Sequence, residues 1–122
     1  MLTYRYFTWL LRLYVQLLKL NNITGLQVEP DVYTGDDEEW ITFNYVDENP
    51  SMFADDKAIE DVADMQVHLY VQDTTNYFEL KHKIRDYLEN IGGYGVSIST
   101  VYEKDTKKRH IIFEFEYAEG RN

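Results

Sequence analysis

The fold of this chain is decided by residues 65–117, which read MQVHLYVQ (65–72), NYFELKHKIRDYLENIGG (76–93) and YGVSISTVYEKDTKKRHIIFEFEY (94–117). In the first stretch Val67, Leu69 and Val71 alternate with more polar residues, which predicts a strand with one buried face. In the second, apolar residues recur at the helical period, and the two final glycines predict the end of the helix. The third holds two alternating runs around a short charged turn, which is typical of a β-hairpin.

The other residues complete a single α+β domain over residues 1–122. We expect a helix over residues 3–20, ended by Asn21, Asn22 and Gly25. Residues 26–34 predict an edge strand, because Pro30 has no backbone N–H to donate. Residues 40–46 predict a second strand, residues 47–56 a solvated loop, and residues 58–64 fit either a helical turn or the start of a strand. The order is then α-β-β-β-α-β-β, a mostly antiparallel sheet of four to five strands with two helices packed on it.

The predicted N-terminal helix (1–20) is unusually rich in aromatic residues. Its polar residues form one narrow stripe at helical spacing, namely Arg5, Thr8, Arg12, Gln16 and Lys19. A helix with so thin a polar stripe is buried on more than one side, so one flank should cover its own sheet and the other a second element or a second chain. If a second chain covers it, the candidate subunit-contact residues are Tyr6, Trp9, Leu10 and Leu13, together with Glu114 and Glu116 on the outward side of the last strand. Burial wholly within the chain is the alternative.

The same N-terminal stretch raises the question of a membrane span or a secretory signal. Its basic residues break every apolar run far short of the roughly 18 residues that a span needs. No small-residue cleavage site follows, as a secretory signal would require. We therefore expect no membrane partner.

The negative charge is concentrated in one part of the sequence. The chain has a formal net charge of −10, with 22 acidic and 12 basic residues. Thirteen of the acids but one of the bases lie between Glu29 and Asp64. We expect the acidic segment 36–64 to form a surface that lines a lumen or meets a partner, with candidates Asp36, Asp37, Glu38, Glu39, Asp55 and Asp56. So acidic a chain should bind nucleic acid poorly.

Each motif that could carry a known chemistry has a structural explanation instead. The cluster Gly92-Gly93-Tyr94-Gly95 follows a helix, whereas a phosphate-binding loop precedes one. His68, His82 and His110 lack metal-ligand spacing, and the carboxylates lack the spacing of a calcium loop. The chain has no cysteine, so thiolate chemistry is excluded. We expect no catalytic residue, no metal site and no cofactor.

From about Ile41 onward the chain resembles the small tail-terminator or tail-completion (minor tail) proteins of long-tailed bacteriophages and prophages. The resemblance is carried by an ordered set of elements: WITFNYV (40–46), FADD (53–56) and the strand–helix–hairpin unit (65–117). The final hairpin contains Tyr102-Glu103-Lys104-Asp105-Thr106, which is similar to the Tyr-Glu-x-Asp-Thr turn typical of that family. The resemblance covers about two thirds of the chain, and the first 35 residues depart from it.

The resemblance implies a structural protein without enzymatic activity. Members of the family form a ring, usually a hexamer, which caps the tail tube and presents a surface for joining to the head. The implied partners are further copies of the chain, the tail-tube protein and a head-completion or neck protein, while DNA passes without specific binding. The implied location is the tail or neck of a virion assembled in the bacterial cytoplasm. The alternatives are another neck, connector or tail-tube component, or an acidic metal-binding or DNA-mimic module.

Overall fold

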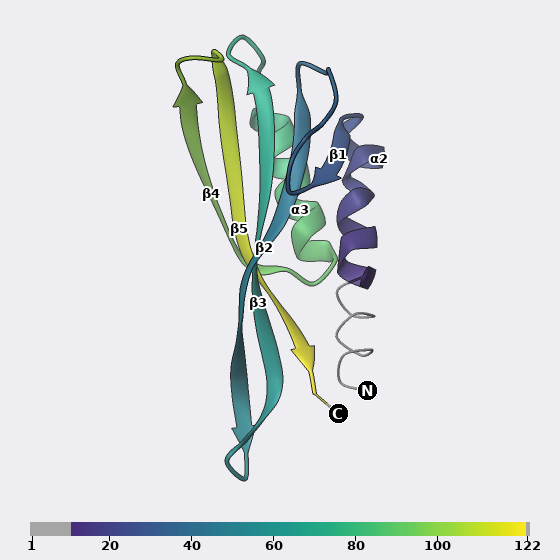
Figure 1. Cartoon of the computed structure of the whole chain (residues 1–122), viewed down its shortest axis with the longest axis vertical. Helices are drawn as coiled ribbons and strands as arrows, with labels where there is room; N and C mark the ends of the chain where they lie inside the picture. The colour runs from purple at the N-terminus through teal and green to yellow at the C-terminus, as the bar shows by residue number, and fades with distance from the viewer. Residues whose placement is uncertain (1–10, 122) are drawn as a thin grey trace.

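The computed structural model describes residues 11–121 and places them in one α+β domain (Figure 1). Within this range, two helices accompany a five-stranded mixed sheet, in the order α-β-β-β-α-β-β predicted from the sequence. The strands are β1 (Gln27–Pro30), β2 (Trp40–Ala54), β3 (Lys57–Gln72), β4 (Tyr94–Glu103) and β5 (Lys108–Gly120). They lie side by side in the order β1-β2-β3-β5-β4.

The sheet is antiparallel except at one edge. β2 pairs with β3, β3 with β5, and β5 with β4, all antiparallel. The short β1 pairs with the start of β2 in parallel, from Gln27 opposite Trp40 to Pro30 opposite Phe43. Pro30 therefore ends a short edge strand, as predicted, where its missing N–H costs the sheet little.

Both helices pack against one face of the sheet. The odd-numbered residues of β3 from Ala63 to Val71 point to this face and are buried. Alternation of this kind is what lets a strand present one apolar face to the core. The helices contribute further fully buried side chains, and the core contains Leu13, Leu17, Leu20, Ile41, Phe43, Ile84, Leu88, Ile111, Phe113 and Phe115.

The N-terminal helix comprises residues 11–18, a turn at Lys19 and α2 (Leu20–Thr24). It ends at Gly25, which adopts a left-handed conformation (φ 74°) and donates its backbone N–H to the carbonyl oxygen of Asn21. Glycine is favoured there because it alone has no Cβ to clash in that conformation. The predicted role of Gly25 is thus confirmed, but the predicted end at residue 20 is wrong, because Asn21 and Asn22 lie within α2; the predicted start at residue 3 lies outside the described residues.

Helix α3 (Phe78–Asn90) lies beside the N-terminal helix on the same face of the sheet. The Tyr87 hydroxyl donates a hydrogen bond of 2.6 Å to the carbonyl oxygen of Gln16, which fixes the two helices together. At the C-terminal end of α3 the backbone N–H of Gly93 reaches the carbonyl oxygen of Leu88 at 2.9 Å. The glycine pair therefore ends this helix as the sequence predicted.

The stretch predicted as a solvated loop over residues 47–56 is instead strand, and that prediction is wrong. β2 continues to Ala54, and the ambiguous stretch 58–64 belongs to β3, which begins at Lys57. The two strands join at Asp55 and Asp56, both with positive φ (52° and 63°), as in a two-residue type I′ turn. We call this hairpin, residues 47–64, the arm; Figure 1 shows it projecting beyond the body of the domain, away from the helices.

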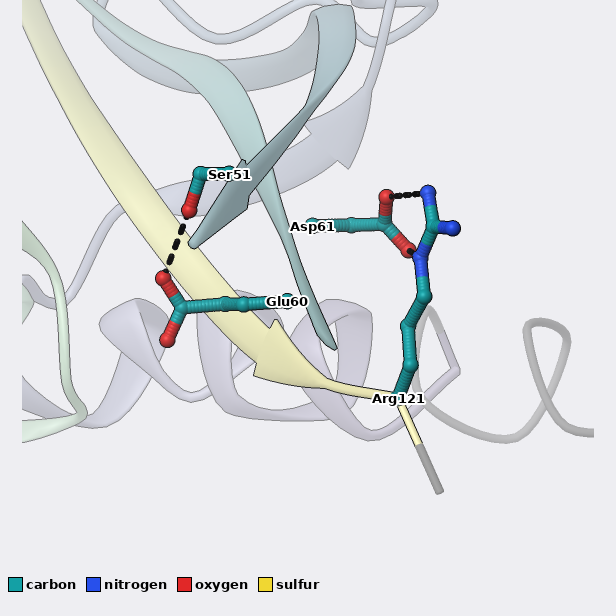
Figure 2. A network of polar contacts seen from close by, with 4 residues as sticks. All are labelled: Ser51, Glu60, Asp61 and Arg121. Carbon is teal, nitrogen blue, oxygen red and sulfur yellow. Dashed lines mark hydrogen bonds and ion pairs between the residues drawn. The ribbon is translucent and has the colours of Figure 1, made fainter. Parts of the chain in front are cut away.

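The middle of the arm is fixed by polar contacts on both of its faces (Figure 2). On one face the Ser51 hydroxyl donates a hydrogen bond of 2.8 Å to Glu60. On the other, the guanidinium of Arg121 binds both carboxylate oxygens of Asp61, with Nε at 2.8 Å from Oδ2. Neighbouring residues of a strand point to opposite faces, so Glu60 and Asp61 of β3 make these two contacts on opposite faces of the sheet.

Candidate assembly surfaces

The residues predicted to contact another subunit fall into three groups in the structure. Tyr6, Trp9 and Leu10 lie outside the described residues. Leu13 is 1% exposed and belongs to the core, so it is not available to a neighbour, and its assignment as a contact residue is corrected. Glu114 and Glu116 are exposed on the sheet face opposite the helices, which we call the open face.

The outer side of the N-terminal helix carries an exposed apolar row. Its members have exposed fractions between 43% and 52% and are Leu11, Val15 and Leu18, which we call the helix stripe. At 100° per residue, Leu11, Val15 and Leu18 lie opposite the core-facing Leu13 and Leu17. The helix is thus apolar on two opposite sides, of which one is buried within the chain.

A second exposed apolar group lies on the arm. Met52 and Phe53 near the end of β2, and Ile59 near the start of β3, are 42% to 64% exposed and flank the acidic turn formed by Asp55 and Asp56. Phe53 is opposite Ala58 in the strand pairing, so Phe53 and Ile59 point to opposite faces, and the tip of the arm is apolar on both of them.

The six carboxylates predicted to form one acidic surface occupy different places. Asp36, Asp37 and Glu38 are exposed in the loop between β1 and β2. Glu39 is half-buried and accepts hydrogen bonds from the backbone N–H of Gln72 (3.0 Å) and the Thr75 hydroxyl (2.6 Å), so it fixes a loop. Asp55 and Asp56 form the tip of the arm, at the opposite end of the molecule from the β1–β2 loop (Figure 1).

The open face carries an acidic hollow next to the base of the arm. Its volume is about 340 Å³, and its lining includes Asp64, Gln66, Ser97, Glu114 and Glu116. A hydrogen bond with Asp47, followed by burial and the negative charges nearby, raises the pKa of Asp64 to about 6. Like charges this close disfavour ionisation of one another, so the raised pKa of Asp64 is a consequence of the carboxylates that lie together at this hollow.

Next to the hollow, five rings stack across the open face. Tyr33 stacks on Trp40 (ring centroids 4.8 Å apart), Trp40 on Tyr70 (5.0 Å), and Tyr70 on His110 (4.2 Å), which in turn meets His68 (4.9 Å). The stack follows the strand register, in which Trp40 is opposite Tyr70 and Tyr70 is opposite His110. Cross-strand ring pairs of this kind stabilise a sheet.

A directed chain of hydrogen bonds runs beside these rings. His68 Nε2 lies 2.7 Å from Asn44 Oδ1, which can only accept, so this nitrogen carries the proton. His68 Nδ1 is then the acceptor for the N–H of His110 Nε2 at 2.7 Å. Burial, with a contribution from His110, lowers the pKa of His68 to about 4. The pair is therefore neutral at neutral pH, and each ring has a defined orientation.

Sequence reasoning did not find this stack or the arm. It placed His68 and His110 on strands, but the pairing of β3 with β5 that brings them together is not visible in a local pattern. The signal available for the stack was the second face of the alternating strand 65–72, where His68 and Tyr70 follow one another at the spacing of a strand. For the arm, the Asp-Asp pair between two runs was a weak turn signal.

Two structural findings bear on the class of protein. Within residues 11–121, no group of three or more His, Cys, Asp or Glu side chains is arranged to hold a metal ion. In the same range, no helix has the length and apolarity to cross a membrane.

No protein-family model matches the chain, and no curated protein matches its sequence.

Proposed function

We propose that this protein is a structural subunit that associates with copies of itself into a ring, in the manner of the phage tail-terminator proteins it resembles. In this role the ring caps a tail tube and contributes to joining the tail to the head. The observation that carries the proposal is the pair of exposed apolar surfaces, the helix stripe and the arm. A chain with two such surfaces at different places has the contacts that a cyclic assembly needs.

The distribution of charge supports the same role. A ring at the end of a tail tube encloses a channel through which DNA passes, and acidic walls repel the phosphates of DNA. The net charge of −10 and the acidic hollow with Glu114 and Glu116 supply such walls. The expected partners are the tail-tube protein and a head-completion or neck protein, and the expected site is the tail or neck of a virion assembled in the bacterial cytoplasm.

Light scattering coupled to size-exclusion chromatography, followed by negative-stain microscopy, tests the proposal. The expected result is a closed ring, formed by the protein alone or on addition of the tail-tube protein. A protein that stays monomeric at all concentrations, with and without the tail-tube protein, would refute it. Rings that bind within the length of the tube rather than at its end would favour the alternative of a tail-tube component.

A further inference from the structure

The base of the arm is crossed by a row of ionisable side chains on the open face. Asp47 on β2 is opposite Asp64 on β3, and Asp64 is opposite Glu116 on β5. Glu116 is in turn opposite Tyr94, the first residue of β4. Like charges directly opposite one another destabilise a sheet, so three carboxylates in one row need a compensating interaction.

The backbone is irregular at the same level, on both sides of this row. β2 has a register shift between Tyr45 and Asp47, and β4 has another between Tyr94 and Ser97. The pairing of β3 with β5 is regular through this level. A bulge interrupts the ladder of hydrogen bonds and bends its strand, so the arm is held to the body here by fewer backbone hydrogen bonds than a regular sheet provides.

We propose that this row is a proton-controlled latch at the base of the arm. The carboxyl groups of Asp47 and Asp64 share one proton through their hydrogen bond, which holds β2 against β3. When that proton passes to solvent, two carboxylates face each other across the strands. Neither can then donate a hydrogen bond, and their repulsion loosens the arm from the body of the domain. The inference concerns the single chain, so it does not depend on the proposed function.

The neighbouring groups determine which carboxyl groups share the proton. The Tyr94 hydroxyl donates a hydrogen bond to Glu116, so Glu116 is already satisfied as a carboxylate. Three further acids bring negative charge to this part of the open face, namely Glu60, Glu114 and Glu116. Among the described residues that line the hollow, none is basic. Asp64 therefore lies in a negative field, in which a proton shared with Asp47 removes one charge.

The latch changes state between pH 5 and pH 7.5. The hydrogen bond with Asp47, followed by burial and the nearby charges, raises the pKa of Asp64 from its ordinary value of 3.8 to about 6. A loosened arm returns this carboxyl group towards its ordinary pKa, so the ratio of loosened to latched arms increases by up to about tenfold from pH 5 to pH 7.5. Because Asp64 is partly exposed, solvent screening reduces this to about three- to tenfold. His68, on the same face, has a pKa of about 4 and is largely neutral in this range.

The absence of cysteine from the sequence allows two spin labels to be attached at chosen sites. Ala54→Cys near the tip of the arm and Glu89→Cys on α3 are both at exposed positions. Pulsed electron paramagnetic resonance measures the distribution of distances between the two labels, and an excess of unlabelled protein removes distances between copies. We expect one narrow distribution at pH 5 and a second, broad component at pH 7.5, with the ratio of broad to narrow about three- to tenfold higher. A distribution that does not change with pH would overturn the inference.

Two variants of the labelled protein test whether the carboxyl pair is responsible. Asn has nearly the shape of a protonated Asp, and in Asp64→Asn its amide donates to the Asp47 carboxylate at every pH, so the narrow distribution should persist to pH 7.5. Asp47→Asn should behave in the same way, and circular dichroism shows that each variant is folded. Asp105→Asn, in the exposed turn between β4 and β5, is the matched control and should keep the pH dependence. If both variants of the pair broaden with pH as their parent does, the proton is held elsewhere and the inference is wrong.

Discussion

The ion pair in the middle of the arm gives the sharpest test of the energetics of this fold. We predict that Arg121→Ala lowers the free energy of unfolding by about 2–3 kcal/mol. Asp61 has a side chain that is 4% exposed, and the Arg121 guanidinium binds both of its carboxylate oxygens. Without the guanidinium, a buried carboxylate loses the positive charge that offsets its desolvation.

The magnitude follows from the geometry. Removing one member of a buried ion pair costs about 3–5 kcal/mol when both members are desolvated. The Arg121 side chain is 42% exposed, so water can enter the space it leaves, and we expect a smaller loss of about 2–3 kcal/mol. The loss is increased by Glu48, because burial and the nearby Asp61 already raise the pKa of Glu48, while Arg121 opposes this effect.

Urea unfolding followed by circular dichroism measures the change in the free energy of unfolding. For a chain of 122 residues, a loss of 2–3 kcal/mol should lower the melting temperature by roughly 8–12 °C. Arg85→Ala is the matched control, since Arg85 pairs with Asp86 on the exposed side of α3 and such pairs contribute little. If Arg121→Ala is no more destabilising than Arg85→Ala, the account of the buried pair is refuted.

Two further predictions concern the open face and the end of α3. The unfolded chain protonates His68 near pH 6.5 and the folded chain near pH 4, so protons bind the unfolded state preferentially in this window, and the contribution of His68 to stability should fall as the pH is lowered through it. The raised pKa of Asp64 acts in the opposite direction, and to the same extent with and without His68. Because His68 is partly exposed, we expect a loss of about 1–2 kcal/mol in the free energy of unfolding, and this loss should be absent in His68→Gln. Thermal melts of both proteins from pH 7 to pH 4 measure the difference. An equal dependence of stability on pH in the two proteins would contradict the prediction. Gly93→Ala should cost about 1–3 kcal/mol in urea unfolding, because a Cβ at this position would lie 2.8 Å from the Leu88 carbonyl oxygen and 2.8 Å from the Phe115 ring. Gly120→Ala, where a Cβ meets no atom within 4 Å, is its control, and an equal cost in the two variants would contradict the prediction.

The parts of the fold that local pattern determines could be predicted from the sequence. The alternation of Val67, Leu69 and Val71 and the glycine stop after α3 are local signals, and the structure confirms both. The end of the N-terminal helix at Gly25 is of the same kind, since it depends on the conformation of one residue. Each of these elements carries its own periodicity or cap.

The arm could not be predicted because its strands depend on partners distant in the sequence. The stretch from Asp47 to Ala54 contains Pro50 and two acids, which favour a loop when read locally. In the structure this stretch is a strand because it pairs with the start of β3. The other edge of β3 pairs with β5 from Glu60 to Asp64. The buried Asp61–Arg121 pair joins positions sixty residues apart and has no local signature.

The same reason explains what was missed in the candidate surfaces. The two sides of the N-terminal helix were expected from its thin polar stripe, but which leucines face inward depends on where the helix sits on the sheet. The structure turns Leu13 inward and Leu11, Val15 and Leu18 outward. Stacking of Trp40, Tyr70 and His110 likewise needs the strand register, which sequence patterns alone leave open.

The bulge in β2 between Tyr45 and Asp47 lies where the arm leaves the body of the domain. A bulge bends its strand and increases the local twist, so this position sets the direction in which the arm points. An inserted or deleted residue at the bulge would therefore redirect the arm, and with it the exposed side chains near its tip, relative to the body of the domain.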